Sequence, residues 1–226
     1  MDRVAQAIAE LERLARPGGA EGMARYGIAT ADRVLGTGVG DIRALARHMG
    51  RDQPLAEALW NAGVYEARML ACFVADPKVV TPALMDRWAA DFDNWATCDT
   101  ACFHLFDKTP HALAKVCEWA EREEEFVRRA GFVLLASLAV HAKKLDDREL
   151  AALLPLVELG ASDPRNFVKK GVSWALRALG HRRGLHAEAM AMAEVLAASP
   201  EPTRRWIGKD ALRDLSRPLV ARKLGL

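Results

Sequence analysis

Two segments of this chain repeat one helical frame 41 residues apart, and this repeat restricts the folds that the chain can adopt. In the later segment, RNFVKKGVSWALRALG, apolar residues recur at the spacing of one helix face, about 100° per residue. This face carries Val168, Val172, Ala175, Leu176 and Leu179. The earlier segment, EFVRRAGFVLLASLAV, repeats the face with Val127, Gly131, Leu134, Leu135 and Leu138. Helices that share a frame at this distance are expected to stack as equivalent members of a helical repeat.

The opposite side of the later helix carries aromatic and cationic residues, namely Phe167, Lys170, Trp174 and Arg177. In the earlier helix, Phe126 and Arg129 stand in the places of Phe167 and Lys170. We expect this stripe to face solvent, because aromatic rings and cations together suit an anionic, stacking partner better than they suit a core. An ordinary solvated charged surface is the alternative.

Almost every other segment also has the pattern of a helix. Proline and glycine separate the expected helices, which cover residues 3–16, 20–27, 39–49, 54–63, 65–76, 82–91, 95–106, 110–121, 124–141, 147–160, 164–180, 185–198, 201–214 and 216–223. The 41-residue spacing lies within the range of HEAT and armadillo repeats, about 40–47 residues. A weaker echo relates WALRAL at 174–179 to DALRDL at 210–215. The sequence therefore predicts an all-α fold, an α-α superhelix of HEAT-like helical repeats, with a single domain over residues 1–226.

Charge is distributed unevenly along the chain. The net charge is +2, but residues 163–226 hold 13 Lys and Arg against 6 Asp and Glu, while residues 1–162 hold 19 against 24. An anion is therefore expected to prefer the C-terminal third. Stacking of equivalent helices would bring cations of successive repeats onto one concave, basic face. The candidates for this face are Arg129, Lys170, Arg177, Arg205 and Arg213.

The composition excludes several protein classes. Hydrophobic residues make up 51% of the 226 residues, as in a globular protein. No apolar run reaches the length of a membrane span, and the charged N-terminal segment has the pattern of an amphipathic helix rather than of a signal peptide. The four cysteines include no CxxC pair, so we expect a reduced cytoplasmic setting; Cys98, Cys102 and His104 lie close together without zinc spacing, so we expect buried side chains there rather than a metal site. Trp60, Trp88 and Trp119 are expected in the core.

The segment DFDNWATCDTACFHLF contains a second group of candidate residues. Trp95 and Asp99 are four residues apart and therefore share a helix face. Asp99 lies at the edge of an apolar stripe that includes Cys98 and Cys102, so we expect it to be partly buried. A partly buried carboxylate needs a cation or a hydrogen-bond donor, and Arg129 of the next repeat is a candidate. The alternative is a structural Asp–Arg pair beside a core tryptophan.

Taken in order, these segments resemble the DNA alkylation repair proteins, the HEAT-like-repeat alkylpurine DNA glycosylases of the AlkD type. GMARYGI and VLGTGVGDIRALA are similar to the N-terminal helices and turn of that family, and ALWNAGVYEARMLA is similar to its next repeat. WATCD is similar to its W-x-x-x-D element. EFVRRAGFVLLASL and NFVKKGVSWALRAL are similar to its two adjacent groove helices. The resemblance covers almost the whole chain.

The resemblance implies an enzyme that hydrolyses the N-glycosidic bond of cationic N3- or N7-alkylated purines in double-stranded DNA and leaves an abasic site. Such an enzyme does not need to flip the damaged base, uses no cofactor and acts as a monomer. It would work in the cytoplasm, associated with the bacterial nucleoid when bound to DNA, and not at a membrane.

The resemblance also assigns roles to residues of this chain. Asp99 takes the place of the catalytic carboxylate, with Arg129 beside it, and Trp95 and Trp174 take the places of tryptophans that approach the damaged nucleotide. The residues expected to bind DNA are Tyr26, Arg128, Phe167, Lys169, Lys170, Arg177, Arg205 and Arg213. Asn166 stands where the family has an aromatic residue.

Two other functions remain open at this point. A non-catalytic relative would use the same groove to bind damaged or branched DNA. A protein-binding HEAT scaffold would use the basic face for an acidic partner.

Overall fold

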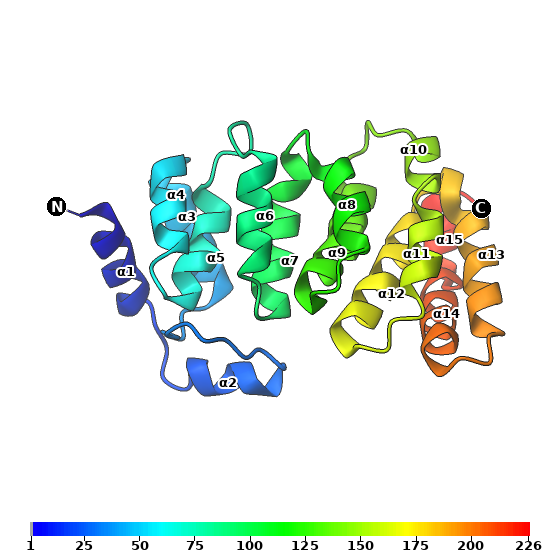
Figure 1. Cartoon of the computed structure of the whole chain (residues 1–226), viewed down its shortest axis with the longest axis horizontal. Coiled ribbons are helices and arrows are strands. Elements are labelled where there is room, and N and C mark those ends of the chain that lie inside the picture. Colours follow the sequence, from blue (N-terminus) through cyan, green and yellow to red (C-terminus); the bar gives the residue numbers. More distant parts are fainter. Residues whose placement is uncertain (1) are drawn as a thin grey trace. The chain divides into compact units, whose positions relative to one another are not determined.

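A computed structural model describes residues 2–226, without the side chain of residue 20, and the regular structure of this range is helical (Figure 1). The α-helices are α1 (Arg3–Arg13), α2 (Gly19–Arg25), α3 (Val39–Met49), α4 (Gln53–Trp60), α5 (Tyr65–Val74), α6 (Pro82–Ala90), α7 (Trp95–His104), α8 (Ala112–Ala120), α9 (Glu125–His141), α10 (Asp147–Ala151), α11 (Leu154–Gly160), α12 (Asn166–Gly180), α13 (His186–Ala197), α14 (Pro202–Leu215) and α15 (Pro218–Leu224). Two short 3-10 turns, η1 (Phe106–Lys108) and η2 (Arg183–Leu185), complete the set. The predicted all-α class is confirmed.

The chain divides into two compact units, a first unit that ends at Thr109 and a second unit from Pro110 to Leu226. In the first unit, α5 packs between α3 and α7, and α4 pairs with α5. The indole rings of Trp60 on α4 and Trp88 on α6 stack at 4.1 Å in its core. Both rings are almost fully buried, as predicted. The single domain predicted over residues 1–226 stays a prediction.

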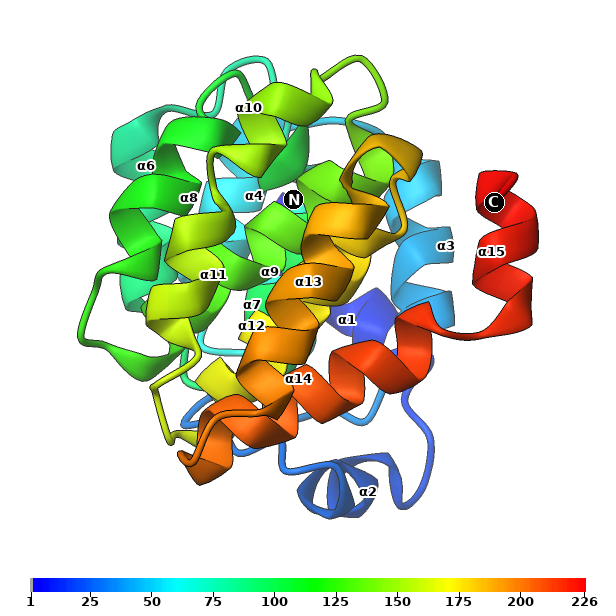
Figure 2. The ribbon, with the colours of Figure 1, turned by 90° about the vertical axis from the view of Figure 1, so that its right-hand side faces the viewer.

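In the second unit, α9 packs against both α8 and α12, and α12 packs in turn against α14. The helix α13 lies along α14, as Figure 2 shows. The two segments of the 41-residue repeat are therefore neighbouring helices, α9 and α12, as the shared frame predicts. Trp119 of α8 is buried, which confirms its predicted place in the core.

Glycine permits the closest helix contacts of the second unit. A Cβ atom on Gly131 of α9 would lie 2.6 Å from the backbone nitrogen of Ala120 in α8. A Cβ atom on Gly208 of α14 would lie 2.2 Å from the backbone nitrogen of Ala197 in α13. Because real Cβ contacts are longer, a larger residue at either position would force the two helices apart.

The boundaries differ from the predicted ones mainly at residues 147–160. The predicted single helix is interrupted, because α10 ends at Ala151 and α11 begins at Leu154. Pro155 lies in the first turn of α11, and a proline inside a continuous helix would clash with the carbonyl group four residues earlier. None of the helices in the described range is long and apolar enough to cross a bilayer.

Candidate functional site

A hydrogen bond joins the N-terminal end of α7 to the residue that follows α2 in the first unit. Trp95 is the first residue of α7, and its indole Nε1–H donates a hydrogen bond of 2.9 Å to the backbone carbonyl of Tyr26. Tyr26 follows α2 and is 72% exposed, whereas Trp95 is half-buried. This hydrogen bond thus joins residues that are 69 positions apart in the chain. This contact brings together two of the residues that the sequence singled out.

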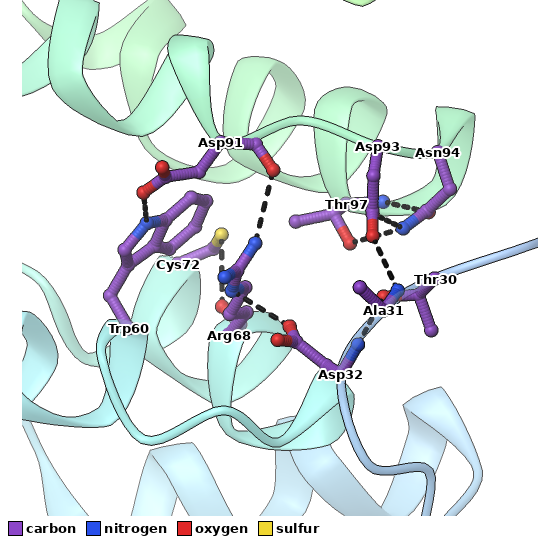
Figure 3. Close-up of polar contacts among 10 residues, drawn as sticks. All are labelled: Thr30, Ala31, Asp32, Trp60, Arg68, Cys72, Asp91, Asp93, Asn94 and Thr97. Carbon is purple, nitrogen blue, oxygen red and sulfur yellow. Dashed lines mark hydrogen bonds and ion pairs between the residues drawn. The ribbon is translucent and has the colours of Figure 1, made fainter.

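The start of α7 is held in place by a polar network (Figure 3). The buried side chain of Asn94 caps α7 by accepting hydrogen bonds from the N–H groups of Ala96 and Thr97. Asp93 accepts a hydrogen bond of 2.9 Å from the backbone N–H of Ala31, in the segment that follows Tyr26. A helix N-terminus needs such acceptors for its free N–H groups. Capping and anchoring therefore fix Trp95 and the segment after α2 in one place.

A largely buried ion pair ties this network to α5 (Figure 3). Arg68 of α5 pairs with Asp32 at 2.8 Å, without hydrogen-bond alignment, and donates to the backbone carbonyl of Asp91 at 3.0 Å. Trp60 donates from Nε1 to the carboxylate of Asp91 at 2.8 Å. Burial raises the pKa of Asp32, Arg68 opposes this effect, and the nearby carboxylates of Asp93 and Asp91 add to it. The fold thus holds the carboxylates of Asp32, Asp91 and Asp93 close together near the start of α7.

Asp99 lies one helical turn after Trp95 on α7, and the structure leaves it half-buried, as the sequence predicted. Its neighbours Cys98 and Cys102 are fully buried on the core side of the helix. Burial, together with Cys98, raises the pKa of Cys102 well above its ordinary value. These thiols are therefore core groups, while Asp99 lies on the same helix face as Trp95.

In the second unit, Arg129 differs from the sequence expectation. It is 5% exposed, and its guanidinium donates a hydrogen bond of 2.7 Å to the backbone carbonyl of Phe167. Phe126 and Phe167, the aromatic residues of the repeat, pack against each other at 5.2 Å. The aromatic stripe of α9 and α12 is therefore partly turned inward, because equivalent residues of adjacent repeats contact one another. Lys170, the repeat partner of Arg129, is exposed as predicted.

Two aspartates neutralise several of the predicted DNA-binding arginines. Arg128 lies 3.5 Å from Asp163, which also binds Arg165 at 2.6 Å. Burial favours a higher pKa for Asp163, but hydrogen bonds from Arg165 and the charges of Arg165 and Arg128 outweigh it and lower the pKa. Arg128 is thus held by a carboxylate that remains ionised at neutral pH.

Asp210 of α14 holds the second pair of arginines. It lies 3.5 Å from Arg177 and 3.9 Å from Arg213, and it accepts a hydrogen bond of 2.7 Å from Ser173. Asp210 occupies the position that matches Trp174 in the 36-residue echo between WALRAL and DALRDL. The carboxylate of Asp210 therefore lies close to Arg177, a member of the cationic stripe.

The remaining candidates have other partners or face solvent. The Lys169 ammonium lies 4.7 Å from the ring centre of Trp206, a cation–π contact, and Trp206 is 38% exposed. Arg205 donates to the backbone carbonyls of Ser199 and Pro200 at the start of α14. Trp174 is half-buried.

Comparison with known proteins agrees with this arrangement of helices. The family described as DNA alkylation repair enzyme matches residues 7–215. The chain belongs to this DNA alkylation repair family. A search of curated proteins found no match. One similar solved structure is described as a new family of proteins related to the HEAT-like repeat DNA glycosylases with affinity for branched DNA structures. The two chains share 19% identity with a TM-score of 0.77, over 94% of this chain and 95% of the other. The HEAT-like-repeat fold is therefore confirmed.

For this member of the DNA alkylation repair family, the structure separates residues that sequence reasoning grouped together. It joins Tyr26 to Trp95 and places Asp99 on the same face of α7. It pairs Arg128 with Asp163, and Arg177 and Arg213 with Asp210. Neither aspartate was among the predicted site residues. The 36-residue echo contained a signal for Asp210, whereas Asp163 precedes Pro164 in a loop and no periodic pattern marked it.

Proposed function

We propose that this protein is a DNA glycosylase that hydrolyses the N-glycosidic bond of cationic N3- or N7-alkylated purines in duplex DNA and leaves an abasic site. The observation that carries the proposal is the arrangement at α7, where Trp95, whose indole N–H donates to the backbone carbonyl of Tyr26, shares a helix face with the half-buried carboxylate of Asp99. Membership of the DNA alkylation repair family supports it.

The chemistry of the lesion matches these side chains. An alkylated purine is cationic and leaves readily, and its departure places positive charge on the sugar. The carboxylate of Asp99 would stabilise this charge most strongly in the transition state and would position the attacking water. The rings of Trp95 and Tyr26 would attract a cationic base or sugar, at about 0.5–2 kcal/mol for each favourable contact. Excision on this basis does not require a flipped base, a metal or an organic cofactor.

We include Arg129 and Trp174 in the proposed site on the basis of the family resemblance. The hydrogen bond from Arg129 to the carbonyl of Phe167 fixes one end of its guanidinium. The family resemblance alone assigns Arg129 the role of keeping the Asp99 carboxylate ionised and oriented. Exposed Lys170, with Lys169 and Arg205, would bind the phosphates of one duplex per monomer.

The test compares wild-type protein with Asp99→Asn on duplex DNA that contains N7-methylguanine or N3-methyladenine. We expect alkali-labile breaks with the wild-type protein and a loss of at least about a hundredfold in the single-turnover rate with the variant. Asp76→Asn is a matched control, since Asp76 accepts a hydrogen bond in the turn after α5, which an asparagine oxygen can also accept. No release from any alkylated substrate by the wild-type protein would refute the proposal.

A second function has support from one observation. The similar solved structure is described as having affinity for branched DNA, so a non-catalytic binder of branched DNA is the alternative. Titration of the wild-type protein with a four-way junction and a matched linear duplex separates the two. Tight junction binding without excision of alkylated bases would favour the alternative. Binding with little dependence on salt would point instead to a protein-binding scaffold.

A further inference from the structure

A second cationic site lies in the first unit, outside the residues discussed so far. An open pocket of about 440 Å³ is lined by the ends of three helices and by the turns that follow them. Its polar and aromatic lining consists of Arg43, Arg47, Arg51, Phe73, His104 and Lys108. These residues come from three separate stretches of sequence, and the lining contains no acidic side chain.

The arginines of this pocket have no carboxylate partner. Within residues 2–226, no carboxylate lies within ion-pairing distance of Arg43, Arg47 or Arg51, although the same unit pairs Arg16, Arg33 and Arg87 with acidic groups. All three pocket arginines are exposed. Gathering like charges at an open pocket costs electrostatic free energy, which an anion in the pocket would recover.

Two of the arginines are held in defined positions. The Arg43 guanidinium lies 5.5 Å from the ring centre of Phe73 and donates to Nε2 of His104 at 3.1 Å. His104 in turn packs on Phe73, with ring centres 4.8 Å apart. Arg51 donates to the backbone carbonyls of Phe73 and Ala75 at the end of α5. A guanidinium that is already positioned loses little side-chain entropy when it binds a planar or tetrahedral oxyanion.

We propose that this pocket binds a phosphate group of the DNA strand, with Arg43 and Arg47 as its principal donors. The inference rests on the proposed function for the choice of DNA as the source of the phosphate. Arginine is the residue that best matches a phosphate with paired N–H groups, whereas Lys108 at the rim is already paired with Asp107 at 3.4 Å.

The position of the pocket along α7 supports a DNA strand as its occupant. Trp95 begins this helix, Asp99 lies one turn later, and His104 is its last residue. A helix rises about 1.5 Å per residue, so the pocket end of α7 lies about 13 Å from the Trp95 end. Phosphates of one strand are spaced about 3.4 Å apart along the DNA axis, so a duplex held at Asp99 extends well past that distance. The same helix thus carries residues of both sites, with His104 about 140° around the helix axis from Asp99.

The experiment measures the salt dependence of binding to an undamaged duplex for Arg43→Gln and Arg47→Gln. Each variant should reduce the slope of log K against log salt by about 1 and weaken binding equally for undamaged and alkylated duplexes. Lys78→Gln is the matched control, since Lys78 is exposed in the same unit and is absent from the pocket. We expect this control to leave the slope unchanged.

Two results would overturn the proposal. A lowered melting temperature with an unchanged slope would show that Arg47 only offsets the carbonyl groups at the end of α3, where it lies in the last turn. In an NMR titration with inorganic phosphate, shifts at the pocket combined with an unchanged DNA slope would show that it holds a free phosphate instead.

The proposed function and this inference can fail separately. If the wild-type protein excises nothing and the pocket variants still reduce the slope, the glycosylase proposal fails and the phosphate site stands. If Asp99→Asn abolishes excision and the pocket variants bind like the wild-type protein, the reverse holds.

Discussion

Two arginines of the first unit and two of the second differ in whether a carboxylate lies close to them. In the first unit, Arg43 and Arg47 line an open pocket without any carboxylate within ion-pairing distance in the described chain. In the second unit, Arg128 and Arg177 each lie 3.5 Å from an aspartate. Arg43 and Arg47 thus lack a carboxylate partner in the described part of the first unit, whereas Arg128 and Arg177 of the second unit have one.

This difference shows that net charge along a sequence does not tell which cations lie close to an acidic partner. Charge counts add all residues of a segment, whereas an anion responds to cations that remain unneutralised within a few ångströms. In the second unit, Asp163 and Asp210 cancel part of the field that the count predicts. Lys170 keeps its exposed charge there.

The largest expected effect tests whether burial decides which arginines are paired. Arg68 belongs to the first unit, yet it pairs with Asp32, and both side chains are largely buried. Arg68→Met would leave the Asp32 carboxylate without its cation and close to Asp91 and Asp93. We expect a loss of about 3 kcal/mol in the free energy of unfolding at pH 7, measured by urea denaturation.

The pH dependence provides the control for this prediction. Because the pKa of Asp32 is raised in the folded protein, stability linked to its neutral form is present at low pH and is lost as the pH rises through that pKa. Without Arg68 the pKa should rise further, so the gap between variant and wild type should narrow as the pH falls towards 4. The double variant Arg68→Met/Asp32→Asn should recover part of the loss. A gap that does not depend on pH would contradict this account.

The next prediction concerns the best-formed pair of the second unit. Asp163 binds Arg165 at 2.6 Å, and its pKa is lowered from the ordinary value of 3.8. A lowered pKa means that its stabilisation is complete above that value and is lost as the pH falls through the folded pKa. Asp163→Asn should therefore lose about 1–2 kcal/mol at pH 7. Below pH 4, the thermal stability of the variant should approach that of the wild-type protein.

Glu158→Gln is a suitable control for Asp163→Asn. Glu158 forms a more exposed ion pair with Arg204 in the same unit, so its loss should cost less than about 1 kcal/mol. Equal effects of the two substitutions would contradict the special role of the buried carboxylate.

Much of the fold could be predicted from sequence, because the pattern that marks a helix involves residues close together in the chain. Helical periodicity and the prolines and glycines between segments marked the elements, and the repeated frame paired α9 with α12. The four-residue spacing of Trp95 and Asp99 placed them on one face of α7. These features depend on residues within one or two turns of each other.

The partners of the cations could not be predicted in this way. Arg177 and Asp210 are 33 residues apart, and His104 is 61 residues from Arg43. Such contacts depend on how helices rotate against each other, which no local pattern records. For the same reason the exposure predicted for Arg129 was wrong, because Arg129 is buried and donates a hydrogen bond to the backbone carbonyl of Phe167 on the adjacent helix.

We expect Asp210→Asn to have the smallest effect on stability. This variant nevertheless tests the difference between the two units most directly. Its distances to Arg177 and Arg213 are 3.5 and 3.9 Å, so the ion pairs contribute less than about 1 kcal/mol, and an asparagine oxygen can still accept the hydrogen bond from Ser173. The substitution would release two arginines to bind phosphate.

We therefore expect Asp210→Asn to bind duplex DNA more tightly and with a salt slope steeper by about 1–2, as measured by fluorescence anisotropy across a salt series. Asp214→Asn is the control on the same helix, since Asp214 pairs with His181 and Arg217 and not with Arg177. An equal gain in both variants would reflect net charge alone. A gain confined to Asp210→Asn would show that this aspartate limits how strongly the second unit holds DNA.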